Sequence, residues 1–105
     1  MTDAAAVARL RQLMTDHVGV VRDAAGLRQA LAGIAVIEAG AASETLRNMT
    51  AAATLIAAAA LLRQESRGGH FRTDFPQTDP ARAQRSHLTL ARALEIRCFA
   101  VTELT

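Results

Sequence analysis

A cluster of basic and acidic residues between positions 63 and 79 is the feature of this sequence best suited to chemistry. Its members are four basic side chains and three carboxylates: Arg63, Arg67, His70, Arg72, Glu65, Asp74 and Asp79. Guanidinium groups offer paired N–H donors in a fixed geometry, so the cluster could bind a carboxylate or a phosphate. The alternative, which we favour, is a structural ion-pair loop in which the basic groups stabilise a helix C-terminus and pair with Glu65 and Asp74.

The remaining residues with chemical potential show no recognisable site. His17, His70 and His87 are far apart and stand beside no cysteine pair, so no metal site is predicted. The sequence contains no GxGxxG, Walker or GxSxG pattern, and we assign no catalytic or cofactor-binding residue to this chain. Cys98 is the single cysteine; it allows no internal disulfide, fits a reducing compartment and is predicted to be a small buried hydrophobe.

The elements that position the cluster are predicted to be helices. Apolar residues recur with helical period over residues 2–18, 23–39 and 43–67. Each segment starts at a good N-cap residue, namely Thr2 or Asp3, Asp23 and Ser43. Gly19 and Gly40 end the first two segments.

The third segment contains no helix breaker and is expected to organise the domain. Its apolar stripe consists of Leu46, Met49, Ala53, Ile56 and Ala60. Three helices with one apolar stripe each and short connections satisfy one another as an antiparallel bundle. We therefore predict an all-α fold, a three-helix bundle of the spectrin-repeat type, as one domain over residues 1–105.

Residues 68–80 are predicted to form a long loop, because they contain two glycines, two prolines and no helical period. Residues 81–105 follow as a C-terminal segment, with a short helix expected from about Thr89. Only Phe71 and Phe75 offer the loop apolar anchors, and exposed ion pairs contribute about 0–1 kcal/mol. We therefore expect the loop to be the most mobile internal segment, and Arg72→Ala to leave the melting temperature of this chain nearly unchanged.

Composition narrows the functional classes. Half of the 105 residues are hydrophobic and 3% are aromatic, which excludes a disordered chain and indicates an aliphatic core. The net charge is +2, and apart from histidine all twelve basic residues are arginines. They do not form a patch interleaved with aromatic side chains, so no nucleic-acid partner is predicted. The longest apolar run, Ala51 to Leu62, is shorter than the roughly 20 residues of a bilayer span. With no basic and apolar leader, we expect a soluble, cytoplasmic protein without a membrane partner.

The charged cluster lies within a longer recognisable string. Residues 65–76 read Glu-Ser-Arg-Gly-Gly-His-Phe-Arg-Thr-Asp-Phe-Pro, with Asp79 after them. This string resembles the ESRGxHxRxD(F/Y)P signature in the C-terminal helical domain of the succinate dehydrogenase and fumarate reductase flavoprotein family. Residues 10–14, 17–27 and 46–48 resemble the L-aspartate oxidase branch of that family, and the VGVVRD string at residues 18–23 favours this branch.

The resemblance implies a three-helix domain packed against the FAD-binding and capping domains of a larger enzyme. In this branch the enzyme oxidises L-aspartate to iminoaspartate, the first step of bacterial NAD synthesis. The flavin and substrate residues of the family lie in those other domains, which no part of this chain matches. Arg67, His70, Arg72 and Asp74 are carried over as candidate interface and loop-ordering residues.

The resemblance leads to a non-catalytic, excised domain that binds no flavin itself. A naturally separate module stays open as an alternative. Two further alternatives stay open. One is the equivalent domain of a succinate dehydrogenase or fumarate reductase flavoprotein, which would dock an iron–sulfur subunit; the other is a free-standing helical interaction module. An excised domain would expose the apolar surface that met its neighbours, so we also expect self-association.

Overall fold

The computed structural model describes residues 2–19, 21–82 and 87–104, and four α-helices dominate this part of the chain. They are α1 (Asp3–His17), α2 (Ala24–Ala39), α3 (Glu44–Leu62) and α4 (Leu90–Leu104). Two short strands, β1 (Val21–Arg22) and β2 (Phe71–Arg72), and a 3-10 turn, η1 (Pro80–Arg82), complete the description. The structure agrees with the predicted all-α class. Residues 83–86 and 105 of the predicted C-terminal segment lie outside the described residues.

The starts of the first three helices follow from local capping chemistry, as predicted. The side chains of Thr2, Asp23 and Ser43 each accept a hydrogen bond from the backbone N–H three residues later, at 3.1, 2.7 and 3.1 Å. These bonds satisfy N–H groups that have no partner within the helix. Gly40 caps the end of α2, also as predicted.

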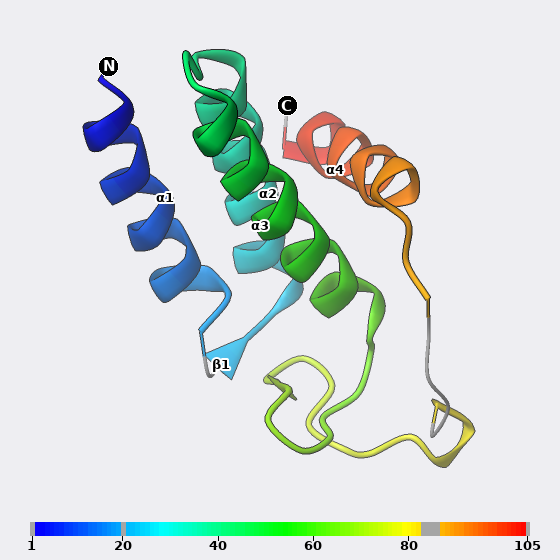
Figure 1. The fold of residues 1–105 in the computed structure, drawn as a ribbon. Coiled ribbons are helices and arrows are strands. Elements are labelled where there is room, and N and C mark those ends of the chain that lie inside the picture. Colours follow the sequence, from blue (N-terminus) through cyan, green and yellow to red (C-terminus); the bar gives the residue numbers. More distant parts are fainter. Residues whose placement is uncertain (1, 20, 83–86, 105) are drawn as a thin grey trace.

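Helix α2 is the centre of the fold, because it packs extensively against α1, α3 and α4, whereas α3 touches α1 only slightly. The chain direction alternates through α1, α2 and α3, and α4 crosses the other side of α2 and α3 (Figure 1). The three-helix prediction is therefore incomplete. The predicted short C-terminal helix has 15 residues and covers apolar surface on α2 and α3 that three helices would leave exposed.

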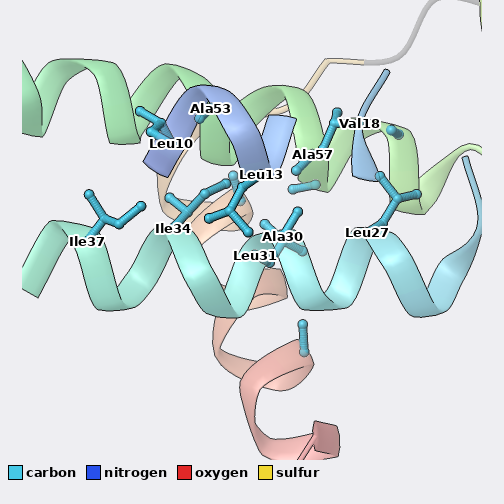
Figure 2. Close-up of a cluster of buried hydrophobic side chains, with 14 of the residues drawn as sticks. Leu10, Leu13, Val18, Leu27, Ala30, Leu31, Ile34, Ile37, Ala53 and Ala57 are labelled. Atoms are coloured by element: carbon cyan, nitrogen blue, oxygen red, sulfur yellow. The ribbon is translucent and has the colours of Figure 1, made fainter. Parts of the chain in front are cut away.

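The core consists of aliphatic side chains and close-packed small residues. Leu27, Leu31 and Ile34 of α2 have no solvent exposure, and Figure 2 shows them along α2 within the cluster of buried hydrophobic side chains. A Cβ atom on Gly33 would lie 2.6 Å from Leu13 Cδ1, so the glycine permits the close approach of α1 and α2. Close contact through small residues compensates for the near absence of aromatic side chains.

Helix α4 is attached by both apolar and polar contacts. Ala93, Ile96 and Ala100 face the core and are buried. Arg97 donates a hydrogen bond to Thr54 Oγ1 at 3.2 Å and pairs with Glu38. One guanidinium group thus joins α4 to both α2 and α3.

The prediction that Cys98 is buried was wrong, since Cys98 is exposed. Helix α4 turns the face that carries Ala93, Ile96 and Ala100 towards the core, and Cys98 lies outside this stripe. The apolar character of the segment did not reveal which face would be covered.

Helix α3 also differs from its prediction. It ends at Leu62 and not at Arg67, because Glu65 and Ser66 bond to the following loop and not within a helix. Ile56, predicted in the core stripe, is 50% exposed, whereas Leu46, Ala53 and Ala60 of that stripe are buried.

By length and composition alone, α3 would be able to cross a membrane. Core helices of soluble proteins meet the same test. In this structure α3 packs against α2 and α4, and Thr50 and Thr54 on it are fully buried within the protein. Its apolar composition is thus explained by its place in the core.

Candidate functional site

The candidate site is the polar segment of residues 65–80, which we call the signature loop. It begins with a tight turn in which the Arg67 and His70 backbones exchange hydrogen bonds of 2.8 and 3.0 Å. Gly68 lies at the tip with φ +57°, a conformation that costs a side chain bearing a Cβ atom about 1–2 kcal/mol. The two glycines therefore form a turn within the loop, because α3 has already ended at Leu62.

The loop then runs beside the connection between α1 and α2. Strand β2 pairs in parallel with β1, with Val21 opposite Phe71 and Arg22 opposite Arg72. Side chains alternate across this two-stranded ribbon: Val21 and Phe71 are 59% and 41% exposed, whereas Arg72 is 1% exposed. The ribbon thus directs its arginines inward and its apolar residues outward.

Arg72 binds the end of α3. Its Nη1 donates to the carbonyl oxygens of Ala60 and Leu61 at 2.9 and 3.0 Å. The last carbonyls of a helix have no partner within it and carry the negative end of the helix dipole. A buried guanidinium group therefore satisfies these acceptors and matches their charge.

The same guanidinium group forms a two-point ion pair with Asp74. Nε donates to Oδ1 at 2.8 Å and Nη2 donates to Oδ2 at 2.7 Å. The hydrogen bond from Arg72 lowers the pKa of Asp74 against the opposing effect of burial. Asp74 Oδ2 also accepts from the N–H of Ala24, the first residue of α2, at 3.2 Å. The Arg72–Asp74 pair therefore connects the C-terminus of α3 to the N-terminus of α2, with a favourable charge at each helix end.

His70 makes a second connection between helix ends. Its Nδ1 lies 2.8 Å from Arg22 Nη1, and its Nε2 lies 3.0 Å from the Arg63 carbonyl oxygen. A guanidinium group only donates, so Nδ1 accepts and the neutral ring carries its proton on Nε2. Burial lowers the pKa of His70, and the charges of Arg22, Arg72 and Arg63 lower it further. Arg22 also donates from Nε to the Gly19 carbonyl oxygen at 3.1 Å, just after α1.

Glu65 organises the other side of the loop. Its side chain is fully buried and accepts from Arg63 at 2.6 Å, from Arg67 at 3.1 Å and from the N–H of Asp79 at 3.1 Å. Burial acts to raise the pKa of Glu65, but these three donors outweigh it and the pKa is lowered. Arg67 closes the ring by donating to the Asp79 carbonyl oxygen at 3.1 Å.

Ser66 completes the internal bonding of the loop. Its Oγ accepts from the N–H of Arg72 at 2.9 Å and donates to the Phe75 carbonyl oxygen at 2.8 Å, while Thr78 donates to the Ser66 carbonyl oxygen at 2.7 Å. Across the described residues, every buried side-chain nitrogen and oxygen atom has a hydrogen-bond partner. The expectation that few local interactions hold this loop was therefore wrong.

The predicted site residues come together as an internal network. Arg67 binds Glu65, Arg72 binds Asp74, and both pairings agree with the ion-pair interpretation. The treatment of Arg72 as an exposed ion-pair member was wrong, because its side chain is 1% exposed and also occupies the last carbonyls of α3. The guanidinium group of Arg72 has few N–H donors left for a ligand carboxylate or phosphate, since the carboxylate of Asp74 already accepts from Nε and Nη2.

Arg22 was missed as a site residue, although it contacts His70 from 48 positions earlier. The available signal was the VGVVRD string itself, which places an arginine directly before the N-cap residue of α2. The string marked the resemblance without showing what the arginine contacts.

A metal site and a dinucleotide site each place specific requirements on the residues that the structure describes. Within the described parts of the chain, no group of three or more His, Cys, Asp or Glu side chains is placed to hold a metal ion. A dinucleotide site needs a strand, a glycine-rich turn and a helix that receives the pyrophosphate. The parallel pair described here has two residues per strand, and the sequence contains no GxGxxG pattern.

Comparison with known proteins identifies the family. The C-terminal domain of fumarate reductase flavoproteins matches residues 38–102, which include α3, the signature loop and most of α4. The chain belongs to this family. No solved structure matches it.

Similar family members include two bacterial L-aspartate oxidases. The protein from Rhodospirillum rubrum is 61% identical over 84 residues, covering 80% of this chain and 30% of the relative. The protein from Caulobacter vibrioides is 48% identical over 86 residues, covering 82% of this chain and 16% of the relative. An uncharacterised FAD-dependent oxidoreductase from Methanocaldococcus jannaschii is 38% identical over 81 residues. The chain thus spans less than a third of the length of these curated relatives.

Proposed function

We propose that this chain is the C-terminal helical domain of a longer L-aspartate oxidase. The whole enzyme would use FAD to oxidise L-aspartate to iminoaspartate for NAD biosynthesis. The observation that carries this proposal is the 61% identity to an L-aspartate oxidase over 80% of the chain, within a flavoprotein family. The single cysteine is in keeping with a cytoplasmic enzyme, which we also propose.

The domain itself would be non-catalytic and would support the FAD-binding and capping domains. We propose that Arg67, His70, Arg72 and Asp74 are loop-ordering residues that fix the surface presented to those domains. Their support is the network that joins the ends of α1, α2 and α3. We further propose that α1–α3 form an antiparallel three-helix unit covered by α4, and that the domain self-associates when separated from its neighbours.

A succinate dehydrogenase or fumarate reductase flavoprotein is the second candidate, because the family description names fumarate reductase. Such an enzyme would exchange electrons with an iron–sulfur partner, whereas an oxidase passes them to oxygen. The two candidates also oxidise different substrates, succinate or L-aspartate, so a comparison of these two substrates separates them.

The test is to purify the longer gene product and the 105-residue chain in parallel. The longer protein should be yellow, retain flavin through gel filtration and consume oxygen when L-aspartate is added. The 105-residue chain should be colourless and inactive. Oxidation of succinate without oxidation of L-aspartate would select the second candidate, and a colourless longer protein would contradict both.

A further inference from the structure

The outer face of the β1–β2 ribbon has an unusual composition for a free surface. Val21 and Phe71 occupy paired positions, so both side chains project from the same face of the ribbon. They are 59% and 41% exposed, whereas the inward face carries the 1% exposed Arg72. Folded proteins ordinarily bury apolar side chains and leave arginine at the surface, and the ribbon does the reverse.

Hydrogen bonds on the inward face of the ribbon hold its two strands against the rest of the domain. Arg22 is bonded to the Gly19 carbonyl and to His70, and Arg72 is bonded to Asp74 and to the end of α3. The N–H of Thr73 donates to the Arg22 carbonyl oxygen at 2.8 Å. Val21 and Phe71 are therefore held in place from behind, without the help of an outer layer.

Parallel strand pairs give a further reason to expect such a layer. Sheets of parallel strands occur almost entirely with both faces covered, and pairs of short strands are unstable without packing. In this chain one face of the pair packs on the helix ends while the other carries exposed apolar side chains. The chain also covers only 16% of the length of its Caulobacter vibrioides relative, so most of that relative's polypeptide has no counterpart in this chain.

We propose that the outer face of the β1–β2 ribbon, centred on Val21 and Phe71, is the contact surface for an apolar patch on the rest of the longer flavoprotein. This inference rests on the proposed function and adds the location and chemistry of the contact. It assigns the contact to the apolar residues of the ribbon, and leaves Arg72 and Asp74 as internal supports.

Cysteine labelling tests the contact directly. Cys98 is exposed and is first replaced by serine, and Val21→Cys, Phe71→Cys or Phe99→Cys is then added. Phe99 is the matched control, because it is a 66% exposed hydrophobic residue on α4. Each variant is labelled with a maleimide in the 105-residue chain and in the longer flavoprotein, and the rate is followed by peptide mass.

The proposal predicts that labelling at positions 21 and 71 is at least about tenfold slower in the longer protein, whereas labelling at position 99 changes little. Equal rates in the two proteins would overturn it, as would a slowing of the same size at position 99. Slowing that grows with the concentration of the 105-residue chain alone, with no slowing in the longer protein, would make a second copy the occupant, which also overturns it.

The outcome is independent of the proposed enzyme activity. A yellow, active longer protein with unprotected ribbon positions would refute this contact alone. A colourless longer protein with protected ribbon positions would refute the proposed function and retain the contact. Phe71→Asp adds a second readout: the melting temperature of the 105-residue chain should stay unchanged, while protease should release the domain from the longer protein faster than it does for Phe99→Asp.

Discussion

Leu27 and Arg72 are equally inaccessible to solvent, at 0% and 1% exposure, but they are held in different ways. Leu27 belongs to a core of aliphatic side chains and alanines. Its stabilisation is the sum of many weak dispersion contacts, none of which is large by itself. Arg72 is held by a few directional bonds, to two helix-end carbonyls and one carboxylate.

The difference shows two ways to order a chain that has few aromatic residues. The helical core tolerates changes that preserve apolar volume, because dispersion contacts have no fixed direction. The signature loop depends on the geometry of individual donors and acceptors, since an unsatisfied buried polar group costs about 1–3 kcal/mol. Substitutions that keep the polarity and approximate size of a side chain should therefore lower the free energy of unfolding only slightly in the core, but strongly in the loop.

The largest effect is expected for Arg72→Ala. It leaves Asp74 and the last carbonyls of α3 without their donor. Each buried acceptor left unsatisfied costs about 1–3 kcal/mol, so the loss of several such bonds should total about 3–5 kcal/mol. Arg92→Ala is the control, because the Arg92–Glu95 pair is exposed and should contribute less than about 1 kcal/mol. Urea denaturation measures both changes, and equal losses for the two variants would contradict the internal role of Arg72.

The next largest effect is expected for Leu27→Ala, which leaves a cavity in the core and should lower the free energy of unfolding by about 2–5 kcal/mol. The informative comparison is between conservative changes. Leu27→Met should cost less than about 1.5 kcal/mol, because it nearly preserves volume. Arg72→Lys should lose most of the arginine contribution, because an ammonium group cannot reproduce the two-point pair. A mild Arg72→Lys variant in the same denaturation experiment would remove the distinction between the two regions.

A smaller effect is expected at the turn of the signature loop. Gly68→Ala should lower the free energy of unfolding by about 1–2 kcal/mol, because alanine resists a positive φ. Gly69→Ala should be nearly neutral, since an added Cβ atom there meets no other atom within 4 Å and Gly69 does not have a positive φ. Thermal denaturation of the two variants makes the comparison, and the same change in both would argue against a fixed turn.

The smallest effect is expected from the titration of His70. Its pKa lies below the ordinary value near 6.5, so the unfolded chain binds more protons in this range and stability falls as the pH is lowered below that value. Asp74 and Glu65 have lowered pKa values as well, but their contribution is lost only as the pH falls below about 4. Between about pH 7.5 and pH 5, His70→Gln should therefore flatten the slope of stability against pH. An unchanged slope would show that Nδ1 is not held by Arg22.

Much of the helical framework was predictable, because capping and periodicity are local. The N-caps at Thr2, Asp23 and Ser43 each depend on an atom three residues away. The end of α3 was not predictable in this way. The residues that draw Glu65 and Ser66 out of the helix lie up to 14 positions later in the chain.

The site was predictable in composition but not in arrangement. The ion pairs of Glu65 with Arg67 and of Arg72 with Asp74 join residues two positions apart, within reach of sequence reasoning. The Arg22–His70 contact joins residues 48 apart and depends on how the helices assemble. The burial of Arg72 has the same origin, because Arg72 can bond the last carbonyl oxygens of α3 only after the loop has folded back against the end of that helix.

The central claim is that the signature loop is a fixed part of the domain, clamped to the ends of three helices. Native-state amide hydrogen exchange of the 105-residue chain tests it most directly. The N–H groups of Arg72 and Thr73, bonded to Ser66 Oγ and to the Arg22 carbonyl oxygen, should exchange within about tenfold of those at Ala53 and Ala57 in α3. Exchange of the two loop amides at the rate of an unprotected peptide, while α3 stays protected, would show that the clamp does not hold the loop.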